Sequence, residues 1–430
     1  MNSRNGLVVV LILFIWFVIS FVTNILGPLM PVIIDNYNLS LTLGAFLPFS
    51  FFLAYGVMSI PAGFLVERYG EKTSMLISFG LNLAGSFLFA LFPGYTVALF
   101  SLFIIGIGMA MLQVIINPLM RVAGGEENFA FFSVMGQLVF GGASFISPFV
   151  FTYLMRNLSN YGGDGNALVD MLSRVIPEGL PWVSLYWIFT AVFVVVLLII
   201  ALVKLPKVEL KDDEKVEALQ SYLSLFRQRK VLLYFAGIMA YVGTEQGVAN
   251  WMSKFLHSYH GISPEGAGAH AISWFWGLMS IGCLVGLVLL KLMDSRRVLK
   301  IFSVLSVISL LLALFGSSSV SLIAFPAIGF FISVMFSIIF SLALNSVKAH
   351  HGAFSGILCS GIFGGALVPL IIGWIGDFVG LRLAMLFLLL TMGYIFSIAF
   401  WARPLVNNKT TTVKEIFASL QTRSLRRKDV

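Results

Sequence analysis

Charge and sulfur are what this sequence has least of. Only 11% of its 430 residues are Asp, Glu, Lys or Arg, and it holds two cysteines, Cys283 and Cys359. Both lie in apolar segments, so the sequence supports neither a disulfide framework nor a metal cluster. It also has no P-loop, no nucleophile elbow and no cluster of His, Cys and Asp at ligand spacing. Nothing therefore indicates an enzyme, a cofactor or a bound metal.

What the sequence has in excess is apolar length. Hydrophobic residues make up 59% of the chain, and the mean hydropathy is +0.97, values outside the range of soluble domains. A membrane crossing needs about 20 apolar residues, and these runs are too uniformly apolar for alternating barrel strands. We expect an all-α polytopic membrane protein with twelve transmembrane helices in two six-helix halves. The expected spans are 6–34, 41–66, 74–91, 96–120, 129–155, 183–203, 231–256, 268–290, 299–315, 320–347, 353–376 and 381–402.

The basic residues fall mostly on one side of these spans. If the N-terminus is inside, the inner segments hold 23 of the 27 Lys and Arg residues. This bias predicts that both termini are cytoplasmic, in a plasma membrane such as the bacterial inner membrane. The net charge of +8 is then a sign of topology and does not indicate nucleic acid. The tail residues Arg423, Arg426, Arg427 and Lys428 either contact anionic membrane lipid or are solvated.

A charged linker divides the chain. A weak internal repeat supports this division, because Phe140-Gly-Gly-Ala recurs as Phe363-Gly-Gly-Ala and Gly63 corresponds to Gly286 at the same offset. The expected domains are an N-terminal six-helix bundle (1–203), a cytoplasmic linker (204–230), a C-terminal six-helix bundle (231–402) and a basic cytoplasmic tail (403–430). Prolines interrupt several spans and are candidate flexing points, because proline removes a backbone donor. They are Pro28 and Pro31, which follow Gly27, and Pro61, Pro118, Pro148 and Pro369.

The turn after the second span carries a recognisable pattern. It reads Gly63-x3-Glu67-Arg68-x-Gly70-Glu71-Lys72 and resembles the loop G-x3-D-R-x-G-R-K of major facilitator superfamily transporters. Glu67 replaces the usual Asp, and Glu71 stands where a basic residue is common. The resemblance implies parallel halves with a substrate site between them. It also makes Gly63, Glu67, Arg68, Gly70 and Lys72 a conformational gate, in which Glu67 latches onto a neighbouring helix N-terminus; the alternative is a solvated turn.

The polar residues inside the spans are few enough to consider singly. Gln113 and Asn117 are four residues apart and therefore share a helix face, which we expect to line a central cavity. The other mid-span polar residues are Asn24, Gln137, Glu245, Gln246 and Asn250. Each amide either contacts substrate or ties two helices together. Glu245 is the only carboxylate near a span midpoint, and an intramembrane carboxylate is a functional hypothesis by default; the alternative is a structural acceptor.

Aromatic and basic side chains complete the candidate site. Trp251, Trp274 and Trp276 offer apolar faces for stacking, and Trp274 and Trp276, two residues apart, should point in different directions. Lys254 is nine residues from Glu245, on the opposite helix face, so the two should not pair. We expect Lys254 to extend toward the outer surface.

Four strings carry a second resemblance. They are MLQVIINPLM from Met111, YVGTEQGVANW from Tyr241, SWFWGLMSIG from Ser273 and FSGILCSGIFGGALVPLIIGWIGD from Phe354. They resemble the fucose–galactose–hexose symporter family, along nearly the whole chain. The resemblance implies cation-coupled uptake of a monosaccharide with a proton or Na⁺, by a protein that acts as a monomer. It associates five residues with the central cavity: Gln113, Asn117, Gln137, Glu245 and Trp276.

The departures from this family leave alternatives open. Gly27 stands where proton-coupled members often have Asp, Gln113 where some have Glu, Phe140 where Asn is common and Cys283 where Arg is typical. A sugar site needs convergent polar groups, and these changes remove four of them. The leading hypothesis is a secondary active transporter of a small polar solute, with a monosaccharide as the favoured substrate. Its alternatives are an exporter of an amphipathic metabolite and a sensor without transport activity on the same fold. In the leading case Glu245 carries the ion, because desolvation favours its protonated form, and we favour a proton over Na⁺.

The loop pattern generates a first prediction. If residues 63–72 latch one conformation, Glu67→Ala and Arg68→Ala should each slow transport while leaving ligand affinity nearly unchanged, since neither residue is expected to touch substrate. Transport rate and equilibrium binding, measured on the same purified variants, separate the two effects. Wild-type rates in both variants would contradict the latch.

Overall fold

The computed structural model describes residues 3–124, 129–159, 161, 166–203, 205, 224–347 and 351–405. These ranges are helical wherever a span was expected, and they contain no strand. The first half holds α1 (Ser3–Asn24), α2 (Leu26–Asn36), α3 (Leu41–Leu91), α4 (Tyr95–Gly124), α5 (Phe129–Ser159), α6 (Ala167–Val175), η2 (Pro181–Val183) and α7 (Ser184–Leu202). The second holds α9 (Arg229–His260), η3 (Pro264–Gly268), α10 (Ala269–Leu292), α11 (Ser295–Phe315), α12 (Ser318–Ile332), α13 (Met335–Leu344), α14 (His351–Ser360), η4 (Gly361–Phe363), α15 (Gly364–Val379), α16 (Leu381–Ala384), η5 (Met385–Phe387) and α17 (Leu388–Trp401). Most of the expected linker, at 204 and 206–223, and the tail from 406 onward lie outside the described residues.

The helices account for the twelve crossings. Ten helical segments within these ranges are long and apolar enough to span a membrane. One of them, α3, has 51 residues, and a straight helix of that length would measure about 77 Å, more than twice the hydrocarbon thickness of a bilayer. It kinks at Gly70, whose φ of 77° and ψ of 166° are reserved for glycine, and so crosses twice. The 32-residue α9 supplies the remaining crossing, although its polar residues lower its hydropathy.

Helix breaks follow proline in one place only. The first span breaks at Ile25, between α1 and α2, because Pro28 has no N–H to bond the carbonyl of Asn24 one turn earlier. The helix is therefore interrupted two residues before Gly27, where the segment of Gly27, Pro28 and Pro31 begins. Pro61, Pro148 and Pro369, by contrast, lie inside α3, α5 and α15. The second half breaks instead at residues 333–334, between α12 and α13, and at η4.

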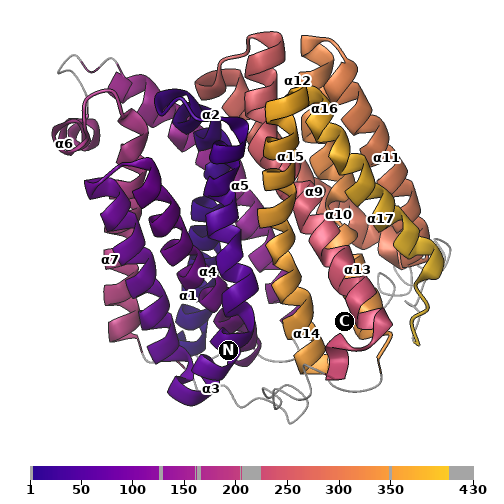
Figure 1. Ribbon diagram of the computed structural model, residues 1–430. Coiled ribbons are helices and arrows are strands. Elements are labelled where there is room, and N and C mark those ends of the chain that lie inside the picture. Colours follow the sequence, from indigo (N-terminus) through magenta and orange to yellow (C-terminus); the bar gives the residue numbers. More distant parts are fainter. Residues whose placement is uncertain are drawn as a thin grey trace, which may run out of the picture.

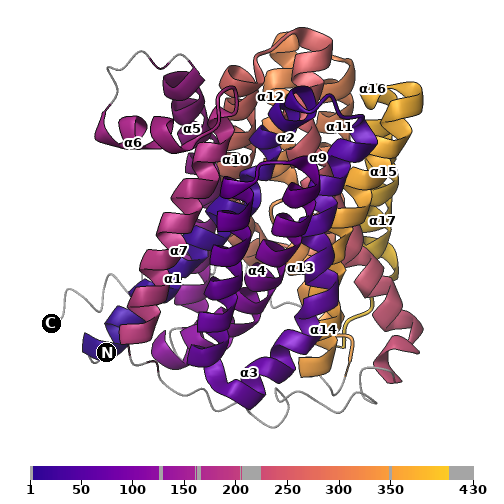
Figure 2. The ribbon, with the colours of Figure 1, turned by 60° about the vertical axis from the view of Figure 1, so that its left-hand side comes forward.

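The helices form two bundles that stand side by side (Figure 1). One apolar core is built almost entirely from residues between Val8 and Ile200, the other from residues between Leu225 and Ala402. Several helix pairs pack across the boundary between the bundles, among them α2 with α9, α3 with α14 and α15, and α5 with α10. The first helix begins and α17 ends at the same face (Figures 1 and 2). We call this the terminal face and the opposite one the far face.

Charged side chains join the two halves at the far face. The carboxylate of Asp377, at the end of α15, accepts hydrogen bonds from the backbone N–H of Leu41 (2.7 Å), the N–H of Thr42 (2.9 Å) and the Thr42 hydroxyl (2.5 Å). It thus caps the N-terminus of α3, where an anion is favoured. Lys254 of α9 pairs with Asp35 of α2 at 2.5 Å, and its side chain is only 13% exposed. Lys254 thus extends toward the surface, as expected, and its ammonium group ends there on a carboxylate of the other half.

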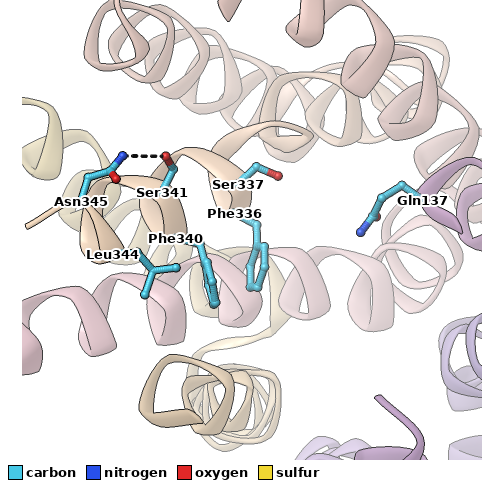
Figure 3. Close-up of a pocket in the computed structure, with 7 residues that line it drawn as sticks. All are labelled: Gln137, Phe336, Ser337, Phe340, Ser341, Leu344 and Asn345. Carbon is cyan, nitrogen blue, oxygen red and sulfur yellow. Dashed lines mark hydrogen bonds between the residues drawn. The ribbon is translucent and has the colours of Figure 1, made fainter. Parts of the chain in front are cut away.

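The boundary is hollow toward the terminal face. A cavity of about 390 Å³ lies between α5 and α13. In Figure 3, Gln137 of α5 faces Phe336 and Ser337 of α13 across this space, and Phe340, Ser341, Leu344 and Asn345 continue the wall toward the end of α13. The backbone N–H of Leu405, which follows α17, bonds the carbonyl of Asn345 at 2.7 Å, which places this end of the wall at the terminal face. A second hollow of about 400 Å³ lies at the far face, beside Asp35, Lys254 and Asp377. The halves are nevertheless joined at the far face, because the side chains of these three residues bond across the boundary there.

The far-face cap generates a second prediction. Asp377→Ala should open the far face more often, because it removes a cap that exists only while the halves are together; a helix cap contributes about 1 kcal/mol, or roughly a fivefold change in the equilibrium. Distances between spin labels at Asn38 and Phe378 would report the opening. Ser317→Ala is the control, since the Ser317 hydroxyl caps α12 at the Val320 N–H and so removes a helix cap that lies within one half. An equal shift in both variants would rule out the interdomain role.

Candidate functional site

A run of polar side chains lies along α9 at mid-span. The Tyr241 hydroxyl donates to Glu245 Oε2 at 2.8 Å, and Gln246 Nε2 donates to Glu245 Oε1 at 3.2 Å. Asn250 Nδ2 in turn donates to Gln246 Oε1 at 3.4 Å. Gln246 and Asn250 are 5% and 1% exposed, whereas Glu245 is half-buried. Both carboxylate oxygens therefore accept a hydrogen bond from a side chain of the same helix.

A second polar cluster joins α1 to α5. Asn24 Nδ2 donates to the Ser144 hydroxyl at 2.8 Å, and the hydroxyls of Ser144 and Ser20 are 2.6 Å apart. Both serines also donate to the carbonyl of Phe140, at 3.1 Å and 2.5 Å. Asn24 Oδ1 is buried and has no hydrogen-bond partner among the described residues. The amide of Asn24 thus ties two helices together and still presents one unused acceptor.

Close packing at Gly27 brings the two clusters to the same depth. A Cβ atom on Gly27 would lie 2.8 Å from the carbonyl oxygen of Ala249 and 3.3 Å from Ile272, so only glycine allows α2, α9 and α10 to meet here. One turn closer to the terminal face, these chain segments carry Asn24, Glu245 and Trp276 respectively. These three residues therefore lie at a similar depth, one turn to the terminal side of this contact.

The cavity wall reaches the α9 cluster through aromatic contact. The ring of Tyr241 lies 5.7 Å from that of Phe336, and Phe336 is stacked on Phe340 at 5.6 Å. Gln137, exposed to the cavity, stands on α5 one turn before Phe140. The cavity thus connects the terminal face to Tyr241, and through it to Glu245.

The tryptophans have different surroundings. Trp251 is fully buried, and its indole N–H donates to the carbonyl of Pro369 at 3.0 Å, so it holds α9 to α15 and offers no free face. Trp274 is 52% exposed and contacts Phe145, whereas Trp276 is 2% exposed. The expectation that these two point in different directions is confirmed. Trp276 Nε1 is buried with no hydrogen-bond partner within the described ranges.

For the expected site residues of α4, the structure describes the backbone of both but the side chain of only one. Gln113 of α4 is half-buried and has an interaction partner. The backbone of Asn117 continues α4 one turn later, but its side chain lies outside the described residues. Whether the two share a cavity therefore stays a prediction.

The loop at residues 63–72 is placed at the terminal face. Gly70 provides its turn, and Lys72 Nζ donates to the carbonyls of Ala201 and Val203 at 2.8 Å and 2.9 Å, which caps the end of α7. Glu67 and Arg68 are exposed, and Arg68 lies 5.4 Å from the Tyr69 ring. No hydrogen bond of Glu67 occurs within the part of the chain that is described, so its role as a latch remains a prediction.

The corresponding turn of the second half is held by Asp294. Its carboxylate caps α11 through the backbone N–H of Arg296 at 2.8 Å and accepts the Arg296 guanidinium at 3.2 Å. Partial burial raises the pKa of Asp294, but the hydrogen bonds and charge of Arg296 outweigh it and leave the pKa below its ordinary value. This turn therefore also carries a carboxylate and a guanidinium, as the first-half loop does, but here the two groups bond to each other.

Sequence analysis missed several polar residues that the fold brings into play. Tyr241 and Glu245 are four apart, so their contact was predictable from helical spacing. Ser20 and Ser144 gave no such signal, because single serines are common in transmembrane helices and their pairing joins positions 124 residues apart. Asp35 and Asp377 lie at span ends, where a carboxylate is not unusual. The described residues also contain no group of three or more His, Cys, Asp or Glu placed to hold a metal.

Comparison with known proteins agrees with this architecture. Residues 12–361 match the family described as Major Facilitator Superfamily. A glucose/galactose transporter of Brucella abortus biovar 1 (strain 9-941) is 30% identical over 90% of both chains. The L-fucose-proton symporter of Escherichia coli (strain K12) is 26% identical over 85% of each. A crystal structure of the E. coli fucose:proton symporter superposes with a TM-score of 0.66 at 22% identity, covering 93% of this chain and 100% of the other.

The contrast between the two buried tryptophans generates a third prediction. Trp251→Phe should lower the stability of the purified protein by about 1–3 kcal/mol, because it removes a buried hydrogen bond. Trp276→Phe should cost less, since its indole N–H has no partner in the described structure to lose. Thermal unfolding in detergent compares them directly. A larger loss from Trp276→Phe would show that its N–H is satisfied within the protein.

Proposed function

Because the chain belongs to the Major Facilitator Superfamily, and is thus an integral multi-pass membrane transporter and not an enzyme, we propose that it carries a hexose or 6-deoxyhexose together with a proton. The relatives support this substrate class by their names, glucose/galactose transporter and L-fucose-proton symporter. Transport then follows alternating access, in which the site opens to one face at a time.

The observation that carries the proposal is that two of the buried polar atoms without a hydrogen-bond partner in the described structure lie at the depth of Glu245. Asn24 Oδ1 is an acceptor and Trp276 Nε1 a donor, and neither has a partner among the described residues. A buried polar group without a partner is costly, and a sugar hydroxyl, which both donates and accepts, supplies either one. Trp276 also offers an apolar ring face to the C–H surface of a sugar. Gln113, Asn117, Gln137, Gln246 and Asn250 are the further candidates for hydroxyl contact.

In this proposal Glu245 carries the coupling proton. Its half-buried carboxylate accepts two hydrogen bonds beside the cavity. If Glu245 takes up its proton from the far side and releases it into the cavity, the conformational step that returns the site to the far side depends on a proton gradient. Na⁺ would require several further oxygen ligands around Glu245, and the neighbours that the structure provides are the donors Tyr241 and Gln246.

The orientation follows from charge. Arg68, Lys72, Lys291 and Arg296 lie at turns on the terminal side, which agrees with a cytoplasmic terminal face in a bacterial inner membrane. The structure would then be open to the cytoplasm. We propose a monomer in contact with membrane lipid, with six-helix domains at 1–203 and 231–402, a linker at 204–230 and a cytoplasmic tail from 403. The loop residues Gly63, Glu67, Arg68, Gly70 and Lys72 form its gate.

Counterflow in proteoliposomes tests the proposed substrate. Vesicles loaded with unlabelled D-galactose, D-glucose or L-fucose should take up the same labelled sugar, and an inward proton gradient should drive its accumulation in the absence of Na⁺. Accumulation that requires Na⁺ would replace the proton as the coupling ion. Absence of exchange with all three sugars would refute the sugar proposal and favour the exporter, whose apolar substrate the Phe336 and Phe340 wall would accommodate.

Glu245 generates a fourth prediction. Glu245→Gln, which mimics the protonated carboxyl, should abolish uphill accumulation while retaining exchange of sugar across the membrane. Glu178→Gln is the control, because Glu178 is an exposed carboxylate in the far-face loop before η2. A Glu245→Gln protein that still concentrates sugar would show that coupling lies elsewhere.

A further inference from the structure

The carboxylate of Glu245 is held from both sides by donors. Tyr241 binds Oε2 and Gln246 binds Oε1, at 2.8 Å and 3.2 Å. A protonated carboxyl keeps some acceptor capacity, but its new hydrogen needs an acceptor of its own. The tyrosine hydroxyl both donates and accepts, and it lies 2.8 Å from Oε2. A proton placed on Oε2 toward Tyr241 therefore reverses the hydrogen bond between the two groups.

Tyr241 also touches the wall of the opening. Its ring packs at 5.7 Å against Phe336, the second residue of α13. That helix is separated from α12 by a break at Ser333 and Val334, where the Cys283 thiol donates to the carbonyl of Ser333 at 3.4 Å. A helix that starts at a break is able to tilt separately from the helix before it. Tyr241 thus links a group that changes charge to an element that is able to move.

Few other titratable groups face Glu245. On α9 the neighbour is Tyr241, and on α10 it is Cys283, which lies within electrostatic range of the carboxylate. The helices α2, α5 and α15 carry charges only at their far-face ends, as Asp35, Arg156 and Asp377, and α13 carries none. The hydrogen bond from Tyr241 is therefore the main local control on whether Glu245 holds a proton.

We infer that Tyr241 is a positioning residue that couples the protonation of Glu245 to the position of α13 at the terminal-side opening. With the carboxylate ionised, the hydroxyl donates to Oε2 and the cavity beside Phe336 is open. When a proton binds Oε2, the hydroxyl turns to accept it, a weaker neutral hydrogen bond replaces the charge-assisted one, and the loosened ring shifts against Phe336. The proton returns to cavity water when the hydroxyl reverts, and no other bond forms or breaks. This inference rests on the proposed role of Glu245.

A carboxyl titration tests the first link without any sugar. Infrared difference spectra of the purified protein between high and low pH contain a protonated-carboxyl band, which is assigned to Glu245 by its loss in Glu245→Gln. In Tyr241→Phe the midpoint of this band should move to higher pH by about one to two units, since a hydrogen bond to a charged group is lost. Tyr394→Phe is the matched control, because the Tyr394 hydroxyl donates to the carbonyl of Leu233, away from Glu245. An unchanged midpoint in Tyr241→Phe would overturn the inference.

A second variant tests the link to α13. Phe336→Leu keeps the Tyr241 hydroxyl and should leave the titration midpoint unchanged, but it should lower the ratio of D-galactose accumulated under a proton gradient while downhill exchange continues. Accumulation at the wild-type ratio would overturn the link. The outcome of Glu245→Gln in the same assay distinguishes a failure of the proposed function from a failure of the present inference. If that variant still accumulates galactose, the proposed function fails; if it is uncoupled while Tyr241→Phe and Phe336→Leu behave as wild type, only the present inference fails.

Discussion

The structure depends on the absence of water from the bilayer core. A polar group there must be satisfied by the protein itself, because lipid tails offer no hydrogen-bond partner. Polar residues at mid-span therefore bond to one another, either between helices, as Asn24 does with Ser144, or along one helix, as Glu245 does with Tyr241 and Gln246. The cores of the two bundles are apolar. In the proposed function, the boundary between them is the place where a polar solute finds partners.

The same constraint explains why the two ends of the boundary are built differently. At the far face the halves are joined by charged groups at helix ends, Asp377 on α3 and Lys254 with Asp35. Water can replace such contacts at modest cost when the halves separate, because surface ion pairs are individually weak. Deeper in, the Gly27 contact with Ala249 is dry backbone packing, which seals the site while the far face is closed.

Gly27 also gives a physical reason for one departure from the symporter family. A carboxylate at this position would need room that the Ala249 carbonyl occupies in the observed state, since even a Cβ would come within 2.8 Å of it. In the proposed mechanism the ionisable group lies instead one turn away on α9, at Glu245. There it is held by donors from its own helix and reaches the cavity through Tyr241 and Phe336.

The sequence by itself determined the class of fold and the helices, because apolar length and uniformity leave a bilayer-spanning chain no other backbone structure. It also identified Glu245 and the amides as candidates, because a polar residue is conspicuous in an apolar span, and Gly70 as a turn. It did not determine which polar residues meet. The pairing of Ser20 with Ser144, of Lys254 with Asp35, and of Asp377 with the start of α3 joins positions more than 100 residues apart. Only the packing of helix against helix decides such contacts, because the spacing of residues along one helix fixes the face that a side chain occupies but not the helix that covers it.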